Sequence, residues 1–207
     1  MKKRFIVSLI VVCVLVPATL SASMFGLSIG ATAQYKQDFA AMQNSIDNET
    51  FAEDFGDINN YEFGADVRLK ILLAEIDLVG MFGSAPGGYT TISVLTSAGI
   101  SLDILNIARV GFGMGPRFNV LIDDDGNATV KDENNADVTV DNFGDVFINS
   151  PVAYRATVDF KLGSMMLGLN YTVDTAYKFK DWQDVQNLFD APLDSGKVGV
   201  SFLFNLI

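Results

Sequence analysis

The side chains with the clearest capacity for chemistry are charged residues spaced two apart in short segments that are otherwise apolar. Arg68 and Lys70 lie in one such segment, and Glu75 and Asp77 lie in the next. A two-residue turn at Leu72-Leu73 places Lys70 opposite Glu75 and Arg68 opposite Asp77 in an antiparallel pair of strands. Opposite charges that face each other in this way predict structural ion pairs.

The same spacing recurs further along the chain. A three-residue turn at 105–107 places Asp103 opposite Arg109, and Arg155 and Asp159 share one face of a later segment. We therefore predict an ion-pair network on one face of a sheet, formed by Arg68, Asp77, Lys70, Glu75, Asp103, Arg109, Arg155 and Asp159.

Several kinds of catalytic site are excluded by composition. The chain has no histidine, so no imidazole can serve as a base or bind a metal. Its one cysteine, Cys13, allows neither an intrachain disulfide nor a cysteine-based zinc site. Glu75 and Asp77 each face a base, and a paired carboxylate is a poor general acid. We therefore predict a protein that is not an enzyme and needs no cofactor.

The N-terminus has the pattern of a secretory signal peptide. Three basic residues, 2–4, precede an apolar run at 5–16 and a small, polar segment at 17–23. We predict a signal peptide at 1–22 and one domain at 23–207. An anchor helix is the alternative, but the apolar run is shorter than the roughly 20 residues that span a membrane. Removal of the signal leaves 11 basic and 25 acidic residues, a net charge of −14 that disfavours binding to nucleic acid.

The rest of the chain alternates apolar and polar residues, as strands do. Eight segments show this period: 25–36, 61–71, 74–82, 90–104, 108–120, 152–162, 165–174 and 197–206. In each segment the charges lie on one face and the apolar side chains lie on the other. A soluble sandwich or barrel would bury the apolar face, whereas an outer-membrane barrel turns it toward lipid.

Three features favour the membrane orientation. The polar face is rich in glycine and serine, which suits a narrow lumen, and its charges can pair with one another. Aromatic residues gather near the strand ends, as membrane girdles do, at Tyr35, Tyr61, Phe63, Phe82, Phe118, Tyr154 and Tyr171 and at Phe25, Phe160, Phe202 and Phe204. We predict an all-β fold, an eight-stranded antiparallel up-and-down transmembrane β-barrel.

The connections agree with a barrel because they alternate between long and tight. Long loops at 37–60, 121–151 and 174–196 and an intermediate one at 83–89 alternate with tight turns at 72–73, 105–107 and 163–164. Both termini then lie at the tight-turn, periplasmic end. Pro116 cannot donate a ladder hydrogen bond, so we expect a bulge or a strand end there.

The chain resembles the small eight-stranded outer-membrane proteins, a group that includes the membrane domain of OmpA, OmpX and OmpW. The most specific segment is 197–204, in which Lys197, Gly199, Phe202 and Phe204 are similar to the C-terminal signal read by the barrel-insertion machinery. Three more residues follow Phe204, whereas family members commonly end on that aromatic. The resemblance implies Sec-type export, insertion into the lipid of a Gram-negative-type outer membrane, and long loops outside the cell.

Basic and acidic residues are nearly balanced on the predicted inner face, which favours a paired polar plug over an ion-selective pore. We expect a structural or surface-interaction role. The alternative is a narrow, OmpW-like passage for small apolar molecules, lined toward the outer half of the lumen by Val79, Met81, Leu95 and Met166. A soluble secreted β-barrel binding protein is the third possibility.

The long loops carry the surplus acid and are the candidate site for an extracellular ligand. Asp123, Asp124 and Asp125 form a weak candidate for Ca²⁺, but the run does not match an EF-hand loop, and diffuse attraction of cations is the better interpretation. Segments 129–131 and 136–140 predict a hairpin that extends the barrel, and 181–189, around Trp182, predicts a short helical turn.

Overall fold

The computed structural model describes residues 25–207 except 127, 132–136, 140–142 and 182. The predicted signal peptide, residues 1–22, lies outside the described residues and stays a prediction.

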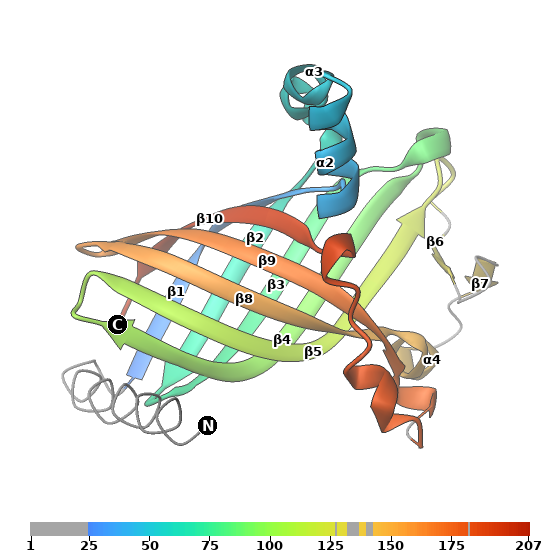
Figure 1. Cartoon of the computed structure of the whole chain (residues 1–207). Helices are drawn as coiled ribbons and strands as arrows, with labels where there is room; N and C mark the ends of the chain where they lie inside the picture. The colour runs from blue at the N-terminus through green and yellow to red at the C-terminus, as the bar shows by residue number, and fades with distance from the viewer. Residues whose placement is uncertain (1–24, 127, 132–136, 140–142, 182) are drawn as a thin grey trace, which may run out of the picture.

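Eight strands form a closed antiparallel barrel (Figure 1). They are β1 (Phe25–Tyr35), β2 (Tyr61–Ile71), β3 (Ala74–Ser84), β4 (Thr90–Ile104), β5 (Ala108–Ile122), β8 (Pro151–Leu162), β9 (Met165–Lys178) and β10 (Lys197–Asn205). Each strand pairs with its neighbour in the chain, β10 pairs with β1, and this closure leaves no open edge. The predicted closed barrel of eight antiparallel strands is confirmed, although β3, β5 and β9 extend beyond the predicted ends.

The three tight turns lie where the sequence predicts them, at 72–73, 105–107 and 163–164. Gly163 has a φ of 71°, as the first central position of a type II′ turn requires. The predicted register is also confirmed, because Lys70 lies opposite Glu75 and Asp103 lies opposite Arg109. The first described residue, Phe25, and the end of β10 both lie at the tight-turn end, as expected.

Pro116 neither ends β5 nor shifts its register, so that expectation is wrong. The β4–β5 ladder is interrupted next to Pro116 but resumes at Leu95 and Arg117 in the same register. On its other side β5 pairs with β8 as far as Pro116 and no further. The β4–β5 ladder lacks two pairs here, Thr96 with Pro116 and Ser97 with Gly115, as expected where proline has no N–H to donate, and the pairs on either side keep the register.

The loops at the other end carry short elements. The first loop holds α2 (Phe39–Asp47), α3 (Phe51–Gly56) and the 3-10 helix η1 (Ile58–Asn60), and the second holds η2 (Pro86–Gly88). The third loop holds β6 (Ala128–Lys131), β7 (Asp137–Thr139) and α4 (Phe143–Asn149), and the last holds η3 (Phe179–Asp181), η4 (Val185–Leu188) and η5 (Leu193–Ser195).

The predicted extension hairpin is present, because β6 pairs with both β5 and β7. The predicted helical turn at 181–189 corresponds in part to η4, while Trp182 lies outside the described residues. No helix in the described part of the chain is long and apolar enough to cross a membrane.

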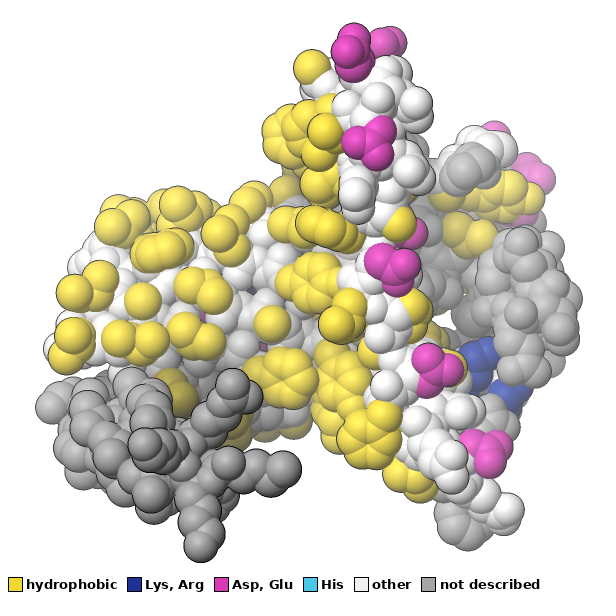
Figure 2. Space-filling model, in the orientation of Figure 1, with side chains coloured by type: hydrophobic (Ala, Val, Ile, Leu, Met, Phe, Trp, Pro, Cys, Tyr) yellow, Lys and Arg dark blue, Asp and Glu magenta, His cyan; other side chains and the backbone are white. Residues whose placement is uncertain are grey.

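The barrel is polar inside and apolar outside. Among the described residues, the largest fully buried side chains include Arg68, Lys70, Asp66 and Asp159, whereas the exposed large side chains of the strands are aliphatic and aromatic. Figure 2 shows these hydrophobic side chains covering the visible barrel wall. This arrangement is the reverse of that in a soluble barrel, so the soluble binding protein is not supported.

Two members of the predicted outer aromatic girdle are covered by loops. Tyr35 is 3% exposed and packs against Phe55 of α3, with ring centroids 5.8 Å apart. Phe118 packs against Phe147 of α4 at 6.1 Å. Alternation alone places both rings on the lipid side, but it cannot show that a loop folds back over them.

Candidate functional site: a charge-filled lumen

The lumen holds three groups of charged side chains stacked along the barrel axis. Nearest the tight turns, Asp103 is the common acceptor. Its carboxylate accepts a hydrogen bond from Lys70 and one from Arg109 Nε at 3.0 Å. It also forms an ion pair with Lys161 Nζ at 2.5 Å. Glu75 lies 3.5 Å from Arg109 in the same group. This group therefore holds three bases and two carboxylates, so its charges nearly balance.

The middle group spans the barrel. Arg68 on β2 donates to Asp159 on β8 at 2.6 Å, and Arg155 on β8 donates to Asp66 on β2 at 2.7 Å. In the closed ring β2 and β8 are four strands apart, so these two strands face each other across the diameter. The two bonds therefore bridge the full width of the lumen.

Asp66 and Asp77 complete this middle group. Asp66 also accepts from Arg68 at 2.9 Å and from the Ser201 hydroxyl at 3.0 Å, and Arg155 donates to Asp77 at 2.8 Å. All of these groups are buried, so each charge has lost its hydration and is stabilised by its partners.

The third group lies toward the loops and centres on Arg117. Its guanidinium donates to Gln34 and to the Ser93 hydroxyl, both at 3.1 Å. Glu62 and Asp174 lie 4.0 and 3.6 Å from it. Gln34 is on β1 and Arg117 is on β5, which are again four strands apart, so this contact also crosses the lumen.

An apolar layer separates the middle and outer groups. It consists of Val79, Met81, Leu95 and Ala153, which form one buried cluster. The sequence places Met166 in this layer, and that placement is wrong. Met166 lies opposite Leu203 and Lys161, next to the 163–164 turn, and is fully buried at the tight-turn end. The signal for its depth is in the sequence, because Met166 follows the tight turn predicted at 163–164 by two residues and therefore belongs to the tight-turn end.

The structure brings all eight predicted network residues into the lumen but pairs some of them differently. Lys70 bonds Asp103 and not the facing Glu75, and Arg68 bonds Asp66 and Asp159 and not the facing Asp77. A long side chain reaches past its cross-strand neighbour in a narrow barrel. Register identifies only the facing neighbour, whereas Lys70 on β2 reaches Asp103 two strands away on β4, and Arg68 reaches Asp159 across the lumen.

Three residues that the site prediction leaves out are central here. Asp66, Lys161 and Arg117 each make close ionic contacts in one of the three groups. Alternation places all three on the inward face, and that is the signal available in the sequence. Their roles depend on which strands face each other across the ring.

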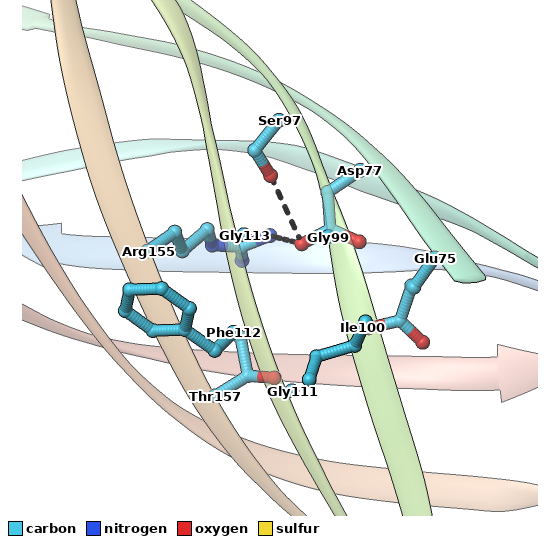
Figure 3. Close-up of a pocket in the computed structure, with 10 residues that line it drawn as sticks. All are labelled: Glu75, Asp77, Ser97, Gly99, Ile100, Gly111, Phe112, Gly113, Arg155 and Thr157. Carbon is cyan, nitrogen blue, oxygen red and sulfur yellow. Dashed lines mark hydrogen bonds and ion pairs between the residues drawn. The ribbon is translucent and has the colours of Figure 1, made fainter. Parts of the chain in front are cut away.

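A small cavity lies beside Arg155 (Figure 3). Its volume is about 10 Å³, close to that of one water-sized sphere, and its lining includes Glu75, Asp77 and Thr157. Arg155 and Ser97 both donate to the same oxygen of Asp77, and the other oxygen is buried with no hydrogen-bond partner among the described residues. Space of this size suits a single water and is too small for a solute path.

The weak Ca²⁺ candidate does not form a cluster. Within the described part of the chain no group of three or more acidic, cysteine or histidine side chains could hold a metal ion. Asp123 instead accepts a hydrogen bond from the backbone N–H of Asp125 at 3.0 Å, which closes a local turn. The predicted insertion signal lies on β10, where Phe202 and Phe204 are exposed on the outer wall and their rings meet edge to face at 5.2 Å.

Comparisons with known proteins identify no family. No protein-family model matches the chain, and no curated protein matches its sequence. Among solved structures, the crystal structure of Neisserial surface protein A (NspA) is similar, with a TM-score of 0.37 and 12% sequence identity over 88% of this chain and 96% of that one. The resemblance to OmpA, OmpX and OmpW stays a prediction, and function is argued from the geometry of the chain itself.

Proposed function

We propose that this protein is an outer-membrane β-barrel that is not an enzyme, with a plugged lumen and a structural or surface-interaction role exercised through its loops. The observation that carries the proposal is the pair of bonds Arg68–Asp159 and Arg155–Asp66, which cross a closed ring whose outer wall is apolar.

The outer wall supports the membrane part of the proposal. Ile29, Leu78 and Phe112 lie near the middle of their strands and expose 42%, 48% and 52% of their surface. So much exposed apolar surface is costly in water but stable in hydrocarbon. The barrel strands have 9 to 15 residues, and a tilted strand needs roughly 9–11 to cross.

The interior supports a plug. Side chains from opposite strands bond across the lumen at two depths, and an eight-stranded barrel has room for little more than its own side chains. A selective ion pore would show unpaired charge of one sign in rings, whereas these charges are paired. With the interior filled, the loops are the parts left to meet partners.

Gel migration and protease protection test the membrane placement. Protein refolded into phosphatidylcholine vesicles is expected to migrate differently with and without boiling, and its strands are expected to resist added protease while the loops are cut. A chain that stays in solution without lipid or detergent and shows no heat-dependent migration would contradict the proposal.

The apolar layer of Val79, Met81, Leu95 and Ala153 supports the alternative, a passage for small apolar molecules. Such a passage would have to open through the charged middle group beneath this layer. Uptake of an apolar dye into vesicles that contain the refolded barrel distinguishes the two, since a plug predicts the same rate as empty vesicles.

A further inference from the structure

The last loop is attached to the outside of the barrel wall. The Tyr154 hydroxyl of β8 donates to the Leu188 carbonyl at 3.0 Å, and the Tyr171 hydroxyl of β9 donates to the Leu193 carbonyl. Both tyrosines lie on outward-facing positions of their strands. The backbone N–H of Ala176 on β9 also donates to the backbone carbonyl of Asp190 in the loop, at 3.1 Å. The loop therefore folds sideways, over the lipid-facing wall.

This fold-back encloses a groove between loop and wall. Its volume is about 460 Å³, within the range of roughly 300–1,000 Å³ that small-molecule sites occupy. Phe112, Tyr154 and Tyr171 contribute from the wall, and Phe189, Ala191 and Leu193 contribute from the loop. Phe189 is 83% exposed and Leu193 is 70% exposed, so the described residues leave most of these two apolar side chains uncovered.

A second groove of similar construction lies on another side of the barrel. It has a volume of about 390 Å³ and lies between the ends of β2 and β3 and the loop residues Ile58 and Tyr89. Aromatic rings continue from α3 onto the barrel wall, because Phe55 lies 5.9 Å from Tyr61 and Tyr61 lies 6.0 Å from Phe63. Lateral folding is thus a feature of two loops.

Charge and apolar surface are separated on these loops. Figure 2 shows hydrophobic side chains on the sides of the projecting loops that face the barrel wall and the tight-turn end, with acidic side chains on the opposite sides. A helix or loop that lies in a membrane interface has this division, with its apolar side in the acyl boundary and its charged side in water.

We propose that the groove over β8 and β9 holds an acyl chain of a membrane lipid, at the end of the chain nearest the headgroup. The loops around the groove then lie on the membrane surface. The groove opens directly onto the wall that faces lipid, so a lipid chain reaches it without leaving the bilayer. This inference rests on the proposed membrane insertion.

Fluorescence quenching by brominated phosphatidylcholine tests the position of the loop. In a Trp182→Phe background, Phe189→Trp reports on the groove, Leu169→Trp reports on the barrel wall, and Asp125→Trp reports on a loop tip in water. The emission of Phe189→Trp is expected to be blue-shifted, because the ring lies in an apolar environment, and to be quenched by lipid brominated near the headgroup. The emission of Asp125→Trp is expected to be quenched only by aqueous acrylamide.

The wall reporter separates the two ways of failing. If Leu169→Trp is quenched by brominated lipid and Phe189→Trp is not, the barrel is inserted and the groove proposal is wrong. If neither reporter is quenched, the membrane placement itself is wrong.

Lipid retention tests occupancy of the groove. After extraction of the refolded protein into detergent, mass spectrometry is expected to find phosphatidylcholine retained on the wild type and lost from Ala191→Trp, whose ring fills the groove. Ala65→Trp is the matched control, because it adds the same ring to an exposed position of β2, which lies across the ring from β8 and away from the groove. Equal retention by both variants would overturn the proposal.

Discussion

Asp66 is the residue on which most of the buried charge in the middle of the lumen depends. Its carboxylate neutralises two guanidinium groups, those of Arg68 and Arg155, at 2.9 and 2.7 Å. Asp66→Ala leaves both short of a partner in a site without bulk water. We expect a loss of roughly 3–5 kcal/mol in the free energy of unfolding, measured by urea titration in lipid vesicles.

The matched control is Asp47→Ala, which removes an exposed carboxylate at the end of α2. Its effect is expected within about 0.5 kcal/mol, as for most surface substitutions. Equal stability of the two variants would show that water reaches Asp66 and that the lumen is wetter than its geometry indicates.

At the scale of single residues, the sequence predicts which way a side chain points and not what it touches. Alternation identifies Lys70 and Asp103 as inward-facing, and the 105–107 turn places Asp103 opposite Arg109. The bond between Lys70 and Asp103 depends on the curvature of three consecutive strands, which no local pattern encodes. The depth of Met166, in contrast, does follow from a local pattern, the tight turn at 163–164 just before it.

At the scale of the strand, the outward face is tested by one substitution at two depths. Ile29 lies in mid-strand opposite Val67, whereas Ile107 lies in a tight turn. Ile29→Arg is expected to destabilise the inserted barrel by roughly 2–4 kcal/mol, and Ile107→Arg by about 0–1 kcal/mol, because the cost of a charge falls toward the interface.

Urea titration of both variants refolded into lipid vesicles measures this difference. Comparable stability of the two would contradict the assignment of apolar side chains to lipid, since depth would then have no effect. A large cost at Ile107 alone would indicate a role for that turn in folding.

The β8–β9 turn gives a second test at this scale. Gly163 has a φ of 71°, in the left-handed region that costs other residues roughly 1–2 kcal/mol. Gly163→Ala is expected to lose about that much stability, while Ser164→Ala is expected to be nearly neutral. The same urea titration decides, and a loss for Ser164→Ala with none for Gly163→Ala would show that the hydroxyl of Ser164 and not the backbone of Gly163 matters.

Elements are predictable from the sequence where their period is regular. All eight strands and three tight turns follow from alternation and from turn residues such as Gly163. The loops follow less well, because tertiary contacts shape them: Tyr154 and Tyr171 attach the last loop to the wall through backbone carbonyls. A tyrosine at a strand end suggests a membrane girdle, and nothing in the sequence indicates its partner.

For the whole molecule, closure of the ring and bonding across it have one consequence for transport. Because Arg68 and Asp159 meet across the lumen, and Arg117 and Gln34 meet at a second depth, a conducting path would need to break two sets of bonds. Wild-type protein in a planar bilayer is therefore expected to show no large, stable openings under applied voltage.

The double variant Arg68→Ala with Asp159→Ala removes one cross-lumen bond without changing the net charge of the interior. Arg155 still neutralises Asp66 at 2.7 Å, so the barrel keeps part of its middle group while losing the volume of two side chains. Brief, small openings are then expected where the wild type is silent. Large openings in the wild type would refute the plug, and silence in the double variant would place the barrier in the apolar layer of Val79, Met81, Leu95 and Ala153 or in the Arg117 group.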